Sequence, residues 1–325
     1  MDILQRMLCA LALLSCAFGV ANIAAAQSYP NKSIRIIVPY PPGGATDVMA
    51  RLIAQKLSES WQQVVVVDNR SGASGTVGSD MVAKSAADGY TLLMQGTQHA
   101  INLSLYKQLP FDTLRDFAPV AFIGSAPFLL VVHPSVPANS VGELIAYIKT
   151  RPGGLNYGSS GIGGGAHLAG EIFKTNAGVQ LTHIAYKGAA PAMVDLLGGQ
   201  LPMVFDPIPT SITQVRGGKI KALAITSARR SALMPELPTI AESGLPGFEV
   251  VAWFGLYAPA ATPKDIVTKL NAEVNRILQL PEIKEKFASL GAESMPMTTD
   301  QFALYLRAEI TKFAKAIKDS GATAE

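Results

Sequence analysis

Residues 33–57 read SIRIIVPYPPGGATDVMARLIAQKL and contain the pattern on which the architecture rests. The β-branched run Ile34–Val38 predicts a buried strand, and the prolines that follow end it. Beyond the glycine pair, apolar residues at positions 49, 52, 53 and 57 fall on one face of a helix. A strand, a tight loop and a helix in this order form the repeating unit of α/β proteins.

The same alternation continues along the chain. Further short apolar runs predict buried strands at residues 64–67, 90–94, 128–132, 155–157, 181–185, 203–205 and 222–226. Amphipathic stretches lie between them, and from Pro263 onward the pattern is helical. The sequence therefore predicts an α/β fold with mostly parallel sheets.

Two segments, Phe128–Pro134 and Trp253–Pro259, resemble each other, because each is a predicted strand that ends in proline before a helix. Such junctions are common, so the likeness is either a coincidence or indicates the two places where the chain crosses from one lobe to the other. If they are crossings, residues 27–127 and 252–325 form the first lobe and residues 128–251 the second. A cleft between lobes is a frequent place for a small-molecule site.

Composition excludes several classes of protein. The 325 residues are 49% hydrophobic and 16% charged, with a net charge of +3. Soluble domains carry about 25% charged residues, so this chain is apolar and carries few charges in comparison. Such a composition excludes intrinsic disorder, a coiled coil and a collagen-like fibre. The 27 basic residues nearly balance 24 acidic ones, and the longest basic cluster is a single pair, which argues against nucleic-acid binding. The length predicts two domains.

Residues 1–26 are predicted to be a signal peptide that directs export to the periplasm. Arg6 precedes an uncharged apolar stretch, and Ala24-Ala25-Ala26 supplies a cleavage site. An uncleaved membrane anchor and lipidation at Cys16 remain as alternatives. Both cysteines, Cys9 and Cys16, lie in this segment, so the mature chain needs no disulfides.

The loop Pro41–Asp47 is the first candidate for binding a ligand. Gly43 and Gly44 let the backbone approach a ligand, and Thr46 or Asp47 is predicted to cap the following helix. A helix start presents free N–H groups and the positive end of a dipole, which favours a carboxylate or phosphate. The alternative is an ordinary strand–helix turn.

A second candidate loop is Tyr157–Gly165, YGSSGIGGG, which also lies between a strand and a helix. Its small residues form a predicted anion-binding nest. It is neither a Walker loop nor a dinucleotide fingerprint, and it contains no Gly-x-Ser-x-Gly elbow. Two such loops, one on each lobe, would hold one end of a small anion across the cleft without a lysine or arginine.

Three further places are ambiguous. The Gly/Ser-rich loop Asn69–Gly78 either lines the site or only packs on the sheet. The segment Gln95–His99 follows a strand and offers polar groups, or is a solvated loop. Asp206 either receives a ligand hydroxyl or amine, or caps a helix. The four histidines lack metal-ligand spacing, so no metal site is expected.

Several motifs together resemble the Bug family, the extracytoplasmic solute receptors of tripartite tricarboxylate transporters. Tyr40–Arg51, YPPGGATDVMAR, is similar to its N-terminal signature. The later blocks that match are Asp88–Leu92, Leu109–Asp112, Asp116–Pro119, Tyr157–Gly161, His167–Glu171, Tyr186–Gly188, Asp195–Gln200 and Glu242–Pro246. Each block alone is weak, but their combination in this order is specific.

The resemblance implies a periplasmic-binding-protein fold, with two α/β lobes, two interlobe crossings and a central cleft that closes on ligand. In the family, the loops matching Gly43–Thr46 and Ser159–Gly164 hold one carboxylate, partly through waters, and the position of Asp206 borders the pocket. The chain departs from the family pattern at Ile162, Gly164 and Pro207, which suggests a less polar ligand. The predicted ligand-binding residues are Tyr40, Gly43, Gly44, Ala45, Thr46, Asp47, Gly96, Thr97, Ser159, Ser160, Gly161, Gly164 and Asp206.

We therefore expect a monomeric periplasmic solute-binding protein that captures a small organic carboxylate for integral membrane permease subunits. No catalysis, cofactor or metal is expected. One alternative is a receptor that presents its ligand-bound form to a membrane sensor kinase. Another is an exported hydrolase, with Ser159 or Ser160 as nucleophile and His167 as base.

Overall fold

The computed structural model describes residues 29–186 and 188–321. Its strands are β1 (Ile34–Val38), β2 (Val65–Asn69), β3 (Thr91–Gly96), β4 (Phe117–Val132), β5 (Leu155–Ser159), β6 (Leu181–Ala185), β7 (Met203–Pro207), β8 (Lys221–Ile225), β9 (Val251–Pro259) and β10 (Glu293–Ser294). Its helices are α2 (Ala45–Trp61), α3 (Thr76–Ala83), α4 (Thr97–Leu105), α5 (Val141–Lys149), α6 (Gly165–Ala177), α7 (Ala189–Leu197), α8 (Ile208–Arg216), α9 (Lys264–Leu278), α10 (Pro281–Ser289) and α11 (Thr299–Ser320), with a 3₁₀ turn at Ala73–Gly75. The predicted signal segment, residues 1–26, lies outside the described residues.

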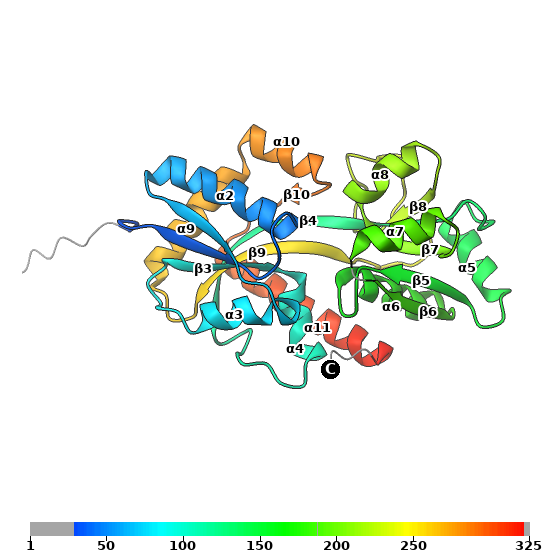
Figure 1. Ribbon diagram of the computed structural model, residues 1–325, viewed down its shortest axis with the longest axis horizontal. Coiled ribbons are helices and arrows are strands. Elements are labelled where there is room, and N and C mark those ends of the chain that lie inside the picture. Colours follow the sequence, from blue (N-terminus) through cyan, green and yellow to red (C-terminus); the bar gives the residue numbers. More distant parts are fainter. Residues whose placement is uncertain (1–28, 187, 322–325) are drawn as a thin grey trace, which may run out of the picture.

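The strands follow the order β2-β1-β3-β9-β4-β7-β5-β6, with β8 and β10 also paired to β4. The long strand β4 belongs to both halves of the molecule (Figure 1). Its residues 117–127 pair with β9, and Phe128–Val132 pair with β7 and β8. We call the part around β1, β2, β3 and β9 the first half, and the part around β5, β6, β7 and β8 the second half.

The two halves share one arrangement. In the first, β1 lies between β2 and β3, all parallel, and in the second β5 lies in the same way between β6 and β7. The prediction of mostly parallel sheets is right for these strands and wrong for β4 and β9, which run antiparallel to their neighbours. Strands buried on both faces read as the same apolar run in either direction, so the sequence did not distinguish them.

All eight predicted strands are present, and residues 34–38 and 181–185 have the predicted bounds. The first part of β4 was missed because Pro119 and Pro127 interrupt its apolar run. The ladder with β9 shifts register after Pro119, which accommodates the missing N–H. The polar segment Gln95–His99 is not a loop, because β3 ends at Gly96 and α4 begins at Thr97.

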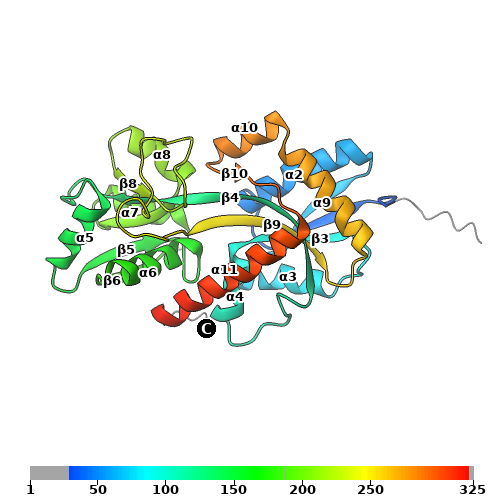
Figure 2. The same cartoon turned by 180° about the vertical axis from the view of Figure 1, so that it is seen from behind.

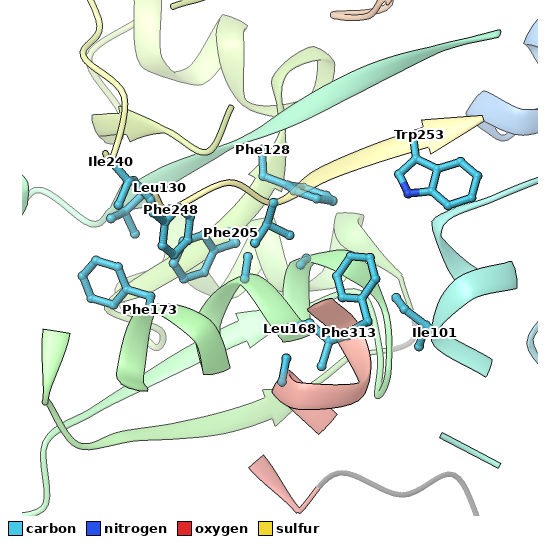
Figure 3. Close-up of a cluster of buried hydrophobic side chains, with 14 of the residues drawn as sticks. Ile101, Phe128, Leu130, Leu168, Phe173, Phe205, Ile240, Phe248, Trp253 and Phe313 are labelled. Atoms are coloured by element: carbon cyan, nitrogen blue, oxygen red, sulfur yellow. The ribbon is translucent and has the colours of Figure 1, made fainter. Parts of the chain in front are cut away.

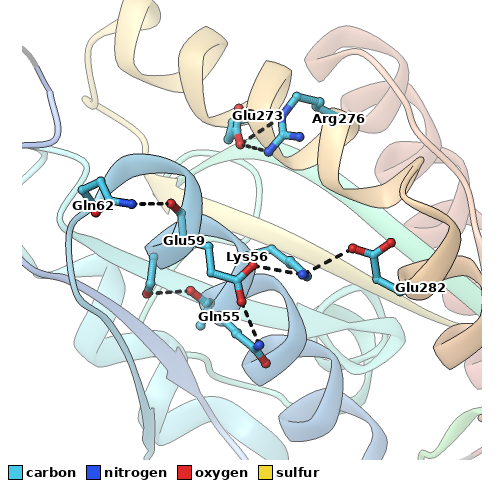
Figure 4. Close-up of polar contacts among 9 residues, drawn as sticks. Gln55, Lys56, Glu59, Gln62, Glu273, Arg276 and Glu282 are labelled. Carbon is cyan, nitrogen blue, oxygen red and sulfur yellow. Dashed lines mark hydrogen bonds and ion pairs between the residues drawn. The ribbon is translucent and has the colours of Figure 1, made fainter.

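Helices cover both faces of the first half: α2, α9 and α10 lie on one side, and α3, α4 and α11 on the other (Figures 1 and 2). On the outer face, Lys56 of α2 forms ion pairs with Glu59 at 2.9 Å and with Glu282 of α10 at 3.3 Å (Figure 4). The two carboxylates are exposed to water and salt, so this pairing contributes little. The apolar cluster beneath, which includes Ile53 and Leu270, holds the layers together.

The C-terminal helix α11 begins in the first half and runs diagonally toward the second (Figure 2). Phe313 is fully buried and belongs to the same apolar cluster as Leu168 and Phe173 of α6 (Figure 3). The cluster also contains Trp253, whose indole nitrogen donates to Glu309 at 2.9 Å. Apolar packing therefore continues from one half into the other through α11. No helix of the described residues is long and apolar enough to cross a bilayer.

Replacing Phe313 with alanine should lower the free energy of unfolding by about 3–5 kcal/mol, the usual cost of removing a buried phenylalanine ring. The matched control is Leu304→Ala on the same helix, because that side chain is 68% exposed and its loss should cost less than about 0.5 kcal/mol. Urea unfolding followed by circular dichroism measures both. Similar stabilities of the two variants would contradict the assigned packing of α11.

Candidate ligand-binding site

The start of α2 follows β1 through the loop Pro39–Gly44. Gly44 is the N-cap, without a capping side chain, so the prediction that Thr46 or Asp47 caps the helix is wrong. Gly43 has φ +90°, a conformation that favours glycine and turns the chain into the helix. The first N–H groups of the helix have no intrahelical acceptor and are available to an anion.

Asp47 is instead the third residue of α2, and its side chain is only 2% exposed. Its Oδ2 accepts from the Gly43 N–H at 2.9 Å and from Arg51 Nε at 3.0 Å. Its Oδ1 accepts from Asn69 Nδ2, also at 2.9 Å. Burial by itself would raise the pKa of Asp47, but these hydrogen bonds and the charge of Arg51 outweigh burial and hold the pKa below its usual value.

The start of α6 has the same form. Gly164 is the N-cap, again without a capping side chain, and Gly163 before it has φ +72°. A Cβ on Gly163 would lie 2.2 Å from Leu105 Cδ2, so a larger residue is also excluded by packing. The Gly163 N–H donates to Nδ1 of His167, the third residue of the helix, at 3.0 Å. A neutral His167 therefore carries its proton on Nε2.

Both helix starts face one cleft of about 800 Å³. Six predicted residues line it, namely Tyr40, Gly44, Thr46, Ser160, Gly161 and Gly164. The other lining residues are Pro41, Pro42, Ser74, Gln98, Ile162 and Gly188. None of these described lining residues is charged, so an anion in the cleft would depend on backbone N–H groups, hydroxyls and amides.

Ser74 and Gln98 were not among the predicted site residues, although both lie in segments considered for a ligand role. They are connected by Asn102, whose Nδ2 donates to the Ser74 carbonyl at 3.0 Å and whose Oδ1 accepts from Gln98 Nε2 at 2.7 Å. Ser74 has φ +53°, an unusual conformation for serine. The residues next to Ser74 do not predict this positive φ, because the contact that holds Ser74 comes from Asn102, which is distant in the sequence.

Ser159 was predicted to bind ligand, but its side chain is buried and forms hydrogen bonds within its own loop. Its Oγ donates to the Gly161 carbonyl at 2.9 Å and lies 2.7 Å from Nε2 of His183. The His183 ring stacks on His167, with centroids 3.9 Å apart. His167 accepts from Gly163 and Ser159 pairs with His183, so the hydrogen bonds of the structure do not form the predicted pair of Ser159 with His167. Ser160, the other predicted nucleophile, lines the cleft.

Gly96, Thr97 and Asp206 are not among the residues that line this cleft. Thr97 Oγ1 accepts from the Trp253 N–H at 2.8 Å and so connects the end of β3 to β9. Asp206 is 1% exposed and accepts from Ser211 Oγ of α8 at 2.6 Å. Burial raises the pKa of Asp206, although hydroxyl donors lower it in part. The N-cap of α8 is Pro207, without a capping side chain, and Asp206 accepts from the hydroxyls of Thr210 and Ser211 instead of backbone N–H groups. The alternative in which Asp206 caps this helix is therefore wrong.

The described residues contain no group of three or more His, Cys, Asp or Glu side chains that could hold a metal ion. The cleft instead offers the start of one helix from each half, with the glycine-rich turns that precede them. Two α/β halves joined by two crossing segments, with helix starts facing a common cleft, define a class of two-lobed solute-binding proteins.

Comparison with known proteins agrees with this class. Residues 49–322 match the family described as "Tripartite tricarboxylate transporter family receptor". The chain is 40% identical to Protein BugT of Bordetella pertussis over 321 residues, 98% of each chain. It is also 40% identical to R. palustris Rpa4515, solved with adipate, with a TM-score of 0.80 over 91% of this chain and 99% of that one. Rhodopseudomonas palustris MatC with bound malate is 31% identical, with a TM-score of 0.75 over 89% and 100%.

The chain therefore belongs to the tripartite tricarboxylate transporter receptor family. The predicted resemblance to Bug proteins is confirmed, and so is the two-lobed periplasmic-binding-protein fold. The family consists of solute-binding receptors and not of enzymes, as predicted.

The histidine pair makes stability depend on pH. Burial, with the positive charges of neighbouring His167 and Lys174, lowers the pKa of His183 to about 3. An unfolded histidine has a pKa of about 6.5, so the folded state is favoured most above that pH and loses this contribution as pH falls toward 3. Urea unfolding at pH 7 and pH 5 should show a smaller loss of stability in His183→Asn than in the wild type.

His133→Asn is the control, because His133 also lies 2.7 Å from a serine, Ser135, but is not part of the His167–His183 stack. A smaller pH dependence in His183→Asn than in this control would assign the effect to the stacked pair. An unchanged pH dependence in His183→Asn would show that His183 does not contribute.

Proposed function

We propose that the protein is a periplasmic receptor that captures a small organic carboxylate and delivers it to a tripartite tricarboxylate-type transporter. The observation that carries the proposal is the uncharged cleft between the starts of α2 and α6. The family match supports the receptor role, and the relatives solved with adipate and malate support a carboxylate as ligand.

The backbone supplies the attraction for the anion. Each helix start carries roughly half a positive charge, so two starts facing one cleft together offset about one carboxylate charge. The N–H groups of Ala45 and Thr46 on one side, and of Gly165 and Ala166 on the other, have no intrahelical acceptor. A carboxylate placed between them exchanges its water hydrogen bonds for these donors.

Capture requires that the halves close around the ligand. We assign residues 27–127 and 252–325 to one lobe and residues 128–251 to the other. The chain passes between them at β4 and before β9, where the Thr226 N–H donates to the Phe128 carbonyl and the Val250 N–H to the Thr226 carbonyl, both at 3.0 Å. Two adjacent crossings allow a hinge motion about one line.

Export and delivery complete the proposal. Residues 1–26 would be removed as a signal peptide, and the mature protein would act as a monomer in the periplasm. Integral membrane permease subunits would receive the ligand from the closed form. The predicted alternative, presentation of the closed form to a membrane sensor kinase, uses the same cleft, and ligand uptake by a deletion strain distinguishes the two roles.

A thermal-shift screen of the mature protein tests the ligand class. A carboxylate at 100 times its dissociation constant should stabilise the folded state by about 2.7 kcal/mol, because it binds only that state. The panel contains adipate, malate, aromatic acids and aliphatic monocarboxylates, with uncharged sugars as controls. A response to sugars and to none of the acids would contradict the proposal.

Replacing Gly44 with valine should weaken carboxylate binding at least about tenfold and leave the fold intact. A Cβ at Gly44 meets nothing within 4 Å, and the residue lines the cleft, so the added side chain would occupy the space where the anion meets the amides. Gly142→Val is the matched control, since a Cβ there is also unobstructed but lies on α5. Isothermal titration calorimetry measures both, and equal affinities would show that the α2 start does not bind ligand.

A further inference from the structure

One hydrogen bond occurs at both helix starts, although the two sequences differ. The Gly43 N–H donates to Asp47 Oδ2 at 2.9 Å, and the Gly163 N–H donates to His167 Nδ1 at 3.0 Å. In both cases the donor is the glycine before the N-cap and the acceptor is the third helical residue. The same bond made by a carboxylate in one half and an imidazole in the other indicates a requirement for an acceptor at this position.

The backbone at the two starts is also the same. The N-cap residues Gly44 and Gly164 have φ −76° and −77°, with ψ 166° and 162°. Because the cleft contains no charged side chain among its described lining residues, the directions of the backbone N–H groups decide how well an anion is held. The side chain that fixes the preceding glycine therefore fixes those directions.

We propose that Asp47 and His167 are the positioning residues of the ligand site, each holding the amides of its helix start toward the cleft through the N–H of the preceding glycine. This inference rests on the proposed function, since it concerns the same cleft. Neither side chain lines the cleft itself, and each acts through the backbone.

The surroundings explain why the two acceptors can differ. The carboxylate of Asp47 is paired with Arg51, whose Nη2 lies 2.9 Å from Oδ1. His167 instead lies at the end of a row of rings: it stacks on His183 of β6 with centroids 3.9 Å apart, and His183 in turn lies 5.0 Å from Tyr157 of β5. The nearby charges on its own helix, Glu171 and Lys174, pair with each other. A neutral acceptor at this start adds no negative charge close to the bound anion.

The test compares alanine and asparagine at each position, because the asparagine carbonyl oxygen can accept the same hydrogen bond while alanine cannot. His167→Ala and Asp47→Ala should weaken binding about three- to tenfold, the usual effect of one hydrogen bond. His167→Asn should bind within about twofold of the wild type. Asp47→Asn can keep the Gly43 bond only with its amide nitrogen facing Asn69 Nδ2, so it should bind better than Asp47→Ala but less well than the wild type. Calorimetry uses adipate first, then the acid with the largest thermal shift.

Equal losses in the alanine and asparagine variants would overturn the proposal, because ring packing or charge would then matter and the acceptor would not. Unchanged affinity in the alanine variants would also overturn it. Unfolding temperatures are measured for every variant, and His133→Ala serves as a histidine control outside the cleft lining.

A second measurement needs no ligand and separates this inference from the proposed function. In ligand-free ¹⁵N-labelled protein, the Gly163 amide should lose protection from hydrogen exchange in His167→Ala and keep it in His167→Asn. If the wild type bound no carboxylate, the proposed function would fail while exchange at Gly163 still decided whether His167 holds the loop. Equal protection in both variants would overturn the assignment.

Discussion

A carboxylate leaves water only where other hydrogen-bond donors replace its hydration, and this cleft offers backbone N–H groups together with a few hydroxyls and one side-chain amide. The described lining contains no cation, so the proposed anion site would depend chiefly on the free N–H groups at the starts of α2 and α6. Backbone donors have fixed directions, and the molecule must hold two loops from different halves in matching conformations. The residues around the two loops fix these conformations.

Three features hold the loops in place. Glycines at positive φ turn the chain from each strand into its helix, and the side chain at the third helical position binds the preceding N–H. Polar side chains also hold each loop by hydrogen bonds. Asn69 donates to Asp47 at the first loop, and the buried Ser159 contacts His183 at the second. Because these groups are satisfied within the protein, they leave the amides at the helix starts available to ligand.

The relation between the two halves sets how the cleft can work. Strand β4 and the segment that leads into β9 cross between the halves at adjacent points, which permits a hinge, while α11 extends the apolar core of the first half onto α6 of the second. Closure must therefore be compatible with the packing of Phe313 beside Leu168. A hinge of two strands with one bridging helix restricts the direction of motion more than two free linkers would.

The sequence by itself determined the strand–loop–helix units, the glycine-rich turns and the family, because these depend on local spacing and backbone preferences of neighbouring residues. It identified both loops that meet at the cleft and the residues Tyr40, Gly44, Thr46, Ser160, Gly161 and Gly164 that line it. Only the tertiary structure decided that Asp47 and Ser159 face inward as supports, that Ser74 and Gln98 join the lining, and that β4 and β9 run antiparallel to their neighbours. Those outcomes depend on pairing between segments far apart in the chain, and such pairing leaves no periodic signal in either segment alone.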